Sequence, residues 1–87
     1  MGYVYVYRMK KTFVSELLDT FREGAQDGVL EGEALQKALQ RAMLERGLNY
    51  GLLRYWLRSM ANVGLIEMEE AEGRIVRVKV RGMYDTL

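Results

Sequence analysis

Hydrophobic and polar residues recur along the chain with two different periods, and each period predicts a different kind of element. Residues 3–7 read Tyr-Val-Tyr-Val-Tyr. This strict alternation is typical of a strand with valines on one face and tyrosines on the other. From Phe13 to Phe21 the apolar residues follow helical spacing instead, and Thr12 before them can cap a helix. We therefore predict an N-terminal strand followed by a helix.

Two further helices are predicted downstream, and both have clear end signals. The first covers about residues 33–46 and stops at Gly47, because glycine readily adopts the left-handed conformation that ends a helix. The second covers about residues 50–62, with Asn49 as its N-cap. Before both of them, Val29-Leu30 is long enough only for a short piece of strand.

Residues 63–81 are predicted to fold as a β-hairpin. Residues 71–73 contain a glycine and suit a three-residue loop. With that loop, Ile66 lies opposite Val78, apolar side chains share one face of the hairpin, and charged side chains share the other. A shift by one residue would mix the two faces, so the pattern favours this register.

The length of 87 residues favours a single α+β domain spanning residues 1–87. Its expected parts are a strand and basic arm at residues 1–11, a three-helix core at residues 12–62 and the hairpin at residues 63–81. No apolar run approaches the length of a membrane span, and no signal peptide precedes the fold. We therefore expect a soluble, cytoplasmic protein.

The residue types that the chain lacks argue against catalysis. It contains neither cysteine nor histidine. Their absence removes thiolate nucleophiles, the commonest general base and the commonest metal ligands. The sequence also has no glycine-rich phosphate loop, and its glutamates lack the spacing of a calcium-binding loop. We expect no enzymatic activity, no metal and no cofactor.

One long stretch resembles a known DNA-binding architecture. Gly47-Leu48-Asn49 separates the second and third helices, and residues 55–67 read Tyr-Trp-Leu-Arg-Ser-Met-Ala-Asn-Val-Gly-Leu-Ile-Glu. Residues 12–81 resemble the winged helix-turn-helix superfamily, in which small proteins of archaea, their viruses and their plasmids have a similar size. The resemblance implies an α+β winged-helix fold whose third helix enters the major groove of double-stranded DNA. It also implies sequence-specific binding by a regulator of transcription.

The third helix and the hairpin supply the candidate DNA contacts. Arginine binds guanine in a bidentate manner, asparagine suits adenine, and tyrosine hydroxyls commonly bind phosphate. Glycine near the start of the helix would let the helix approach the DNA backbone closely. The candidates are Tyr50, Gly51, Arg54, Tyr55, Arg58, Asn62, Arg74 and Arg77. Any amphipathic surface helix carries a few arginines, so the assignment depends on the place of this helix in the architecture. Trp56, which lies among leucines, is assigned to the core.

The predicted N-terminal strand suggests a second kind of surface. Its valines would pack inward and leave Tyr3, Tyr5 and Tyr7 exposed, as in a protein–protein contact. Alternatively, the strand joins the sheet of its own hairpin and the tyrosines cover the first helix. We favour a homodimer, because short operator-binding proteins usually gain affinity from two half-sites.

A protein-interaction module is the alternative to DNA binding, since winged helices also serve as assembly domains. The net charge is only +1, and residues 63–73 carry four glutamates, which favours that alternative. Binding of single-stranded nucleic acid through the tyrosine strand is a third option, weakened by the short basic arm beside it. The DNA interpretation requires the guanidinium groups of Arg54 and Arg58 to be exposed together and not bound to neighbouring carboxylates. If they are so bound, the protein-interaction alternative takes its place.

Overall fold

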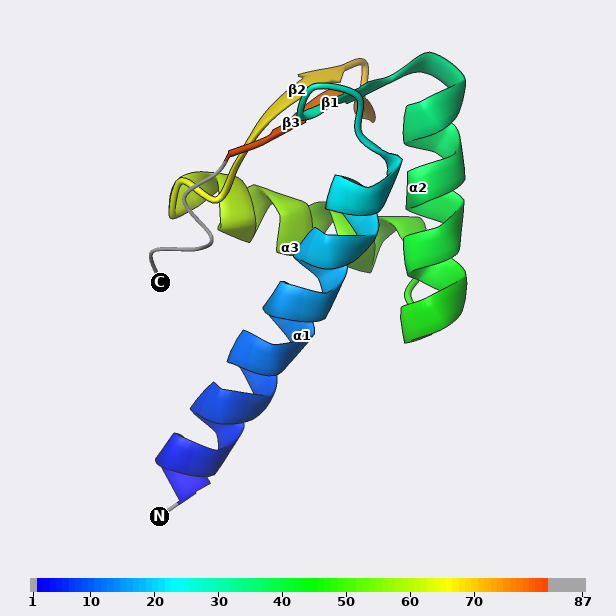
Figure 1. The fold of residues 1–87 in the computed structure, drawn as a ribbon. Coiled ribbons are helices and arrows are strands. Elements are labelled where there is room, and N and C mark those ends of the chain that lie inside the picture. Colours follow the sequence, from blue (N-terminus) through cyan, green and yellow to red (C-terminus); the bar gives the residue numbers. More distant parts are fainter. Residues whose placement is uncertain (1, 82–87) are drawn as a thin grey trace.

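Residues 2–81 form three helices and one antiparallel sheet, so the fold class is α+β, as predicted (Figure 1). The computed structural model describes the backbone of these residues and the side chains of residues 12–81. The elements in chain order are α1 (Gly2–Gly24), β1 (Val29–Glu31), α2 (Gly32–Arg46), α3 (Tyr50–Asn62), β2 (Ile66–Ala71) and β3 (Arg74–Val80).

The prediction of a strand within residues 1–11 is wrong, because α1 already begins at Gly2. Residues 3–23 contain neither glycine nor proline, so no residue in this segment favours an interruption of the helix. Each residue that extends an existing helix adds a backbone hydrogen bond, whereas a strand needs a partner strand to satisfy its backbone. Thr12 therefore lies inside α1 and does not cap it.

The tyrosine surface predicted at this end of the chain depended on the strand. Every second residue shares a face in a strand, and this rule does not apply to a helix. The side chains concerned lie outside the described residues, and they are those of Tyr3, Tyr5 and Tyr7.

The end signals of the second and third helices are confirmed. Gly47 follows α2 with a left-handed backbone (φ 63°), and its N–H donates to the carbonyl of Met43. α3 covers the predicted residues 50–62. Asn49 caps it by accepting a hydrogen bond of 2.8 Å from the N–H of Leu52. These two caps fix the turn between the helices and therefore the direction of α3.

One apolar core joins the three helices and the sheet. Its buried side chains are Leu17, Leu18, Phe21, Leu30, Leu35, Ala38, Leu39, Ala42, Leu53, Leu57, Met60, Leu65, Ile66, Ile75 and Val78. Among the described side chains of α1, which are those of residues 12–24, Leu17, Leu18 and Phe21 are buried, whereas Phe13 and Val14 are only partly buried. Figure 1 shows the first half of α1 extending away from the other elements. Residues 17–21 thus attach the C-terminal half of α1 to the core.

The central strand of the sheet is β3, with β1 and β2 antiparallel on either side. The short strand expected at Val29-Leu30 is therefore a member of this sheet. It pairs Leu30 with Val78, and both side chains are fully buried. Because β3 has a partner on each edge, the hairpin is fixed to the helical core through β1 as well as through its own apolar face.

The predicted hairpin register is wrong by two residues. Ile66 lies opposite Val80 instead of Val78. The turn comprises only Glu72 and Gly73, and both have a positive φ. A two-residue turn of this kind matches the twist of paired strands, which explains why it replaces the expected three-residue loop. Because side chains alternate with a period of two, a shift by two residues leaves those of residues 66–69 and 77–80 on their predicted faces.

An irregularity in the ladder changes the faces near the turn. The register shifts between Glu69 and Glu70, so that β3 carries one extra residue there. As a result Ile75 is buried, whereas Val76 is 43% exposed. Simple alternation along β3 would have placed Val76 inward, and a bulge of this kind leaves no mark in the period-two pattern.

Candidate nucleic-acid interface

One row of α3 faces the β2–β3 hairpin. It consists of Tyr50, Arg54 and Arg58, which are spaced by about one helical turn. The hydroxyl oxygen of Tyr50 accepts a hydrogen bond of 2.8 Å from the backbone N–H of Ile75 in β3. This bond fixes the first turn of α3 to the central strand. The proton of the same hydroxyl can still be donated, so Tyr50 combines a structural contact with a possible phosphate contact.

The other two residues of this row, which we call the α3 arginine pair (Arg54 and Arg58), bind one carboxylate. Nε of Arg54 lies 3.2 Å from Oε1 of Glu70 in β2. Nη1 of the same side chain donates a hydrogen bond of 2.9 Å to the carbonyl of Gly73. Arg58 binds Glu70 in a bidentate manner, with Nε 2.8 Å from Oε2 and Nη2 3.2 Å from Oε1. These hydrogen bonds from Arg58 lower the pKa of Glu70 below its ordinary value.

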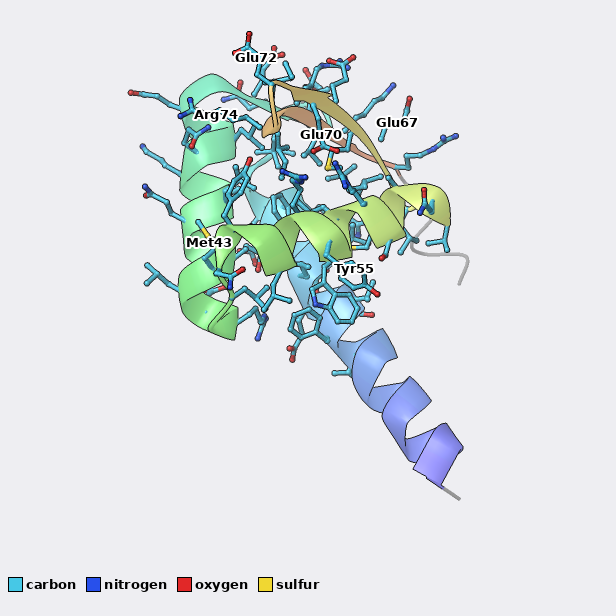
Figure 2. The ribbon with its side chains drawn as sticks, turned by 180° about the vertical axis from the view of Figure 1, so that it is seen from behind. Met43, Tyr55, Glu67, Glu70, Glu72 and Arg74 are labelled. Atoms are coloured by element: carbon cyan, nitrogen blue, oxygen red, sulfur yellow. The ribbon has the colours of Figure 1, made fainter. Side chains whose placement is uncertain are left out.

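Glu70 is the residue of this candidate site that the sequence analysis does not single out. Figure 2 shows it between the hairpin and α3. Side chains of β2 alternate between two faces, so Ile66, Met68 and Glu70 share the face toward the helices. Ile66 is buried and Met68 is partly buried. The side chain of Glu70 lies at the edge of the core and is 23% exposed. The alternation from Ile66 was a signal in the sequence that leads to this position.

A second row of α3 points toward solvent. It consists of Gly51, Tyr55 and Asn62, all of them exposed, and Arg58 is the residue of the first row that borders it. Tyr55 is 62% exposed, and the side chain of Arg58 is 52% exposed. Figure 2 shows Tyr55 on the side of α3 away from Glu70. The single polar face predicted for α3 therefore consists of two adjacent rows. The hairpin contacts the first row, and only the second row faces solvent without such contacts.

An aromatic contact joins α3 to α1. Trp56 is partly buried, in agreement with its predicted core position, and its ring centroid lies 4.8 Å from that of Phe13. The ring of Tyr55 packs edge-on against Trp56 at 5.9 Å. On the same side of α3, Leu52 and Val63 are 48% and 72% exposed. This side of the helix therefore presents apolar surface next to α1.

Arg77, one of the predicted DNA contacts of the hairpin, does not lie beside the α3 arginine pair. Arg77 lies on the face of the sheet that is turned away from the helices, opposite Glu69. Its Nη1 lies 3.8 Å from Oε1 of Glu69, and its Nε lies 3.6 Å from Oε2 of Glu31. Arg74, in contrast, is exposed beside the turn and lines a pocket together with Tyr50 of α3. Of the two hairpin candidates, only Arg74 lies near α3.

The condition that the sequence analysis sets for DNA binding fails in one of its two parts. The α3 arginine pair lies at the surface, but both guanidinium groups are bound to Glu70. One carboxylate faces two guanidinium groups, so these three side chains keep a net charge of +1. The contacts use two of the five N–H donors of each guanidinium. Both arginines of the α3 pair therefore have a carboxylate partner, and by the criterion set from the sequence this outcome favours the protein-interaction alternative.

Comparisons of the chain with protein-family models, with curated proteins and with solved structures gave no match. Among the described residues, no helix combines the length and the apolar character needed to cross a membrane. We therefore base the proposed function on the geometry of α3 and the hairpin.

Proposed function

We propose that this protein is a winged-helix domain that binds double-stranded DNA through α3. The observation that carries this proposal is the open outward row of α3, which runs from Gly51 to Asn62 with Arg58 at its edge. Leu53, Leu57 and other residues on the opposite side bury this helix in the core, and Asn49 caps its start. A rigid helix of this kind fits the major groove of B-DNA. The order α2, turn, α3 and hairpin supports the winged-helix assignment.

Glu70 is the main argument against this proposal, and its weight depends on the strength of its ion pairs. A surface ion pair contributes about 0–1 kcal/mol to stability. The bidentate geometry of Arg58 and Glu70 favours the upper end of that range. A bidentate arginine–guanine contact supplies about 1–3 kcal/mol of discrimination between bases. Neutralised phosphates add further affinity through the release of counterions. Duplex DNA therefore competes effectively with one carboxylate for the α3 arginine pair.

We further propose that two copies of the chain act together in regulating transcription in the cytoplasm. Two copies bind two half-sites about 34 Å apart and so gain affinity over one copy. The first half of α1 extends away from the body, and it carries Tyr3, Tyr5 and Tyr7. We assign the contact between the copies to this segment.

A salt titration of duplex binding tests the proposal. We expect Arg54→Ala/Arg58→Ala to lose at least about tenfold in affinity, because each neutralised phosphate contributes about 0.9 to the log–log salt slope. The slope itself should fall by up to about 1.8 if both arginines bind phosphate. Fluorescence anisotropy with labelled random-sequence duplexes measures both quantities.

The matched control is Arg77→Ala/Lys79→Ala, which removes the same charge from the outer face of the sheet. Both side chains there are paired with glutamates, Arg77 with Glu69 and Lys79 with Glu67. We expect this control to keep most of the affinity. An unchanged affinity in Arg54→Ala/Arg58→Ala, or an equal loss in both double variants, contradicts the assignment of α3.

A protein-interaction module is the second candidate, and the apolar side of α3 favours it. Leu52 and Val63 are exposed there beside Trp56, and apolar side chains suit a protein partner better than phosphate. The binding of Glu70 to the α3 arginine pair favours it as well. Retention on a heparin column supports DNA binding. The second candidate is supported if the protein flows through heparin and co-purifies with a partner protein. The variant Leu52→Ser/Val63→Ser should then no longer bind that partner.

A further inference from the structure

We propose that Glu70 is an internal competitor of the DNA backbone. In the free protein its carboxylate occupies the α3 arginine pair, and in the complex a phosphate group takes its place. This inference rests on the proposed duplex binding and identifies the residue that sets its strength.

The geometry of the Glu70 contact is one that a phosphate can reproduce. Arginine binds a carboxylate or a phosphate through two parallel N–H bonds, because both groups present two oxygen acceptors. Arg58 holds Glu70 in this way, with Nε 2.8 Å from Oε2 and Nη2 3.2 Å from Oε1. Arg54 reaches the same carboxylate at 3.2 Å. The site is therefore arranged around one anion between two guanidinium groups.

The two arginines differ in how firmly they are held. Arg54 has a second contact, its 2.9 Å hydrogen bond to the carbonyl of Gly73, which is independent of Glu70. Among the described residues, the side-chain ion pair and hydrogen bonds of Arg58 all go to Glu70. The side chain of Arg58 is also the more exposed, 52% against 31% for Arg54. Departure of Glu70 therefore releases Arg58 in particular, while Arg54 stays beside the turn.

The position of Glu70 distinguishes it from the other hairpin glutamates. Glu67 and Glu69 lie on the outer face of the sheet, where they pair with Lys79 and Arg77. Glu69 is thus adjacent in sequence, carries the same charge and does not face α3. A substitution of Glu69 therefore provides a matched control, which separates the effect of a carboxylate beside the α3 arginine pair from the effect of total charge.

The test compares Glu70→Gln with Glu69→Gln in duplex binding by the full chain. Both variants remove one negative charge, but only Glu70→Gln weakens the hold on the α3 arginine pair. At about 0.1 M salt we expect Glu70→Gln to bind roughly tenfold more tightly than the natural chain, with a salt slope steeper by about 0.9. Glu69→Gln should differ from the natural chain by less than about twofold, because its carboxylate lies on the other face.

A third variant tests the role given to Arg58. In an Arg58→Ala background, Glu70→Gln should lose most of its gain, because the side chain that it releases is missing. Thermal unfolding of every variant checks that the fold is kept, as expected for substitutions of surface side chains.

Several outcomes overturn the inference. An equal gain in Glu70→Gln and Glu69→Gln would assign the effect to total charge. A loss of affinity in Glu70→Gln would mean that Glu70 orients the arginines for DNA and does not compete with it. If the natural chain binds duplex and Glu70→Gln binds equally well, only this inference fails. If neither binds while both are folded, the proposed function fails together with it.

Discussion

Two regions of the molecule use arginine–glutamate pairs to join neighbouring elements, but their charge balance is opposite. Between α1 and α2, Arg41 lies 2.8 Å from Glu23, and Arg46 lies 3.0 Å from Glu16. Within α2, Arg41 also lies 2.9 Å from Glu45. Three carboxylates there meet two guanidinium groups. Between α3 and β2 a single carboxylate meets two guanidinium groups.

This difference separates a structural contact from a candidate binding surface. The five side chains between α1 and α2 sum to −1, so each arginine there has at least one carboxylate of its own. The three side chains between α3 and β2 sum to +1. Surplus positive charge attracts an anion, whereas surplus negative charge repels it. The same residue types therefore point to different roles, and the count of each sign in a cluster says more than the presence of arginine.

Substitution of Leu57 should have the largest effect, because both regions depend on the same apolar core. Leu57 is fully buried in α3. Leu57→Ala removes buried methyl groups and leaves a cavity, and we expect a loss of about 2–5 kcal/mol in the free energy of unfolding. Leu52→Ala in the same helix, where the leucine is 48% exposed, should cost less than about 1 kcal/mol. Urea unfolding measures both. Similar losses would mean that α3 is not held by its buried side.

Acidification should weaken both regions. The pKa of Glu45 is lowered, chiefly by its hydrogen bond from Arg41, and the pKa of Glu70 is lowered by its hydrogen bonds from Arg58. As pH falls, the unfolded chain therefore binds protons before the folded chain does. The stability from these pairs is complete above the ordinary carboxyl pKa of 4.5 and is lost as pH drops through the lowered values.

Unfolding midpoints measured between about pH 6 and pH 3 should show this loss. Glu45→Gln and Glu70→Gln should each flatten the profile, because each removes one carboxyl group whose pKa is lowered on folding. Profiles that keep the slope of the natural chain in both variants would contradict the link between these ion pairs and stability.

The charge balance itself can be tested with one arginine from each region. Arg41→Ala leaves three carboxylates near one another with only Arg46 beside them, so like charges repel. Arg58→Ala leaves Glu70 paired with Arg54. We expect Arg41→Ala to lower the thermal unfolding midpoint more than Arg58→Ala does. An equal effect, or the reverse order, would remove the distinction between the two regions.

The segment from α2 through its turn to α3 was predictable because its signals are local. Gly47 and Asn49 act through the backbone within a few residues of their own position, and α3 has its predicted ends. The prediction of an N-terminal strand fails because the alternation of apolar and polar side chains covers only five residues. The helix that includes Thr12 extends through this segment instead. The hairpin register fails because Glu72 adopts a positive φ, which its residue type does not signal.

The candidate site was only half predictable, for a different reason. Rotation by about 100° per residue correctly gathers Arg54 and Arg58 on the polar side of α3. It cannot say which part of that side the hairpin covers, because the answer depends on the sheet register and on the bulge beside Glu70. The position of Arg77 could not be predicted for the same reason, because its pairing with β2, and not its charge, determines the face of the sheet on which it lies.

The smallest expected effect concerns Gly51, the second residue of α3. A Cβ atom at this position would lie 3.4 Å from Oδ1 of Asn49, which is close to ordinary contact. Alanine favours a helix over glycine by up to about 1 kcal/mol, so Gly51→Ala should raise the free energy of unfolding slightly. Where the start of α3 approaches the DNA backbone, the added methyl group should at the same time weaken duplex binding.

Stability and affinity should therefore move in opposite directions in Gly51→Ala. Ser59→Ala supplies the control, because it also favours the helix but lies two turns further along α3. This control should keep the affinity of the natural chain. Unchanged or tighter binding by Gly51→Ala would exclude the start of α3 from the interface. The α3 arginine pair would then be left as its centre, and the surplus charge beside Glu70, not the outward row, would carry the binding.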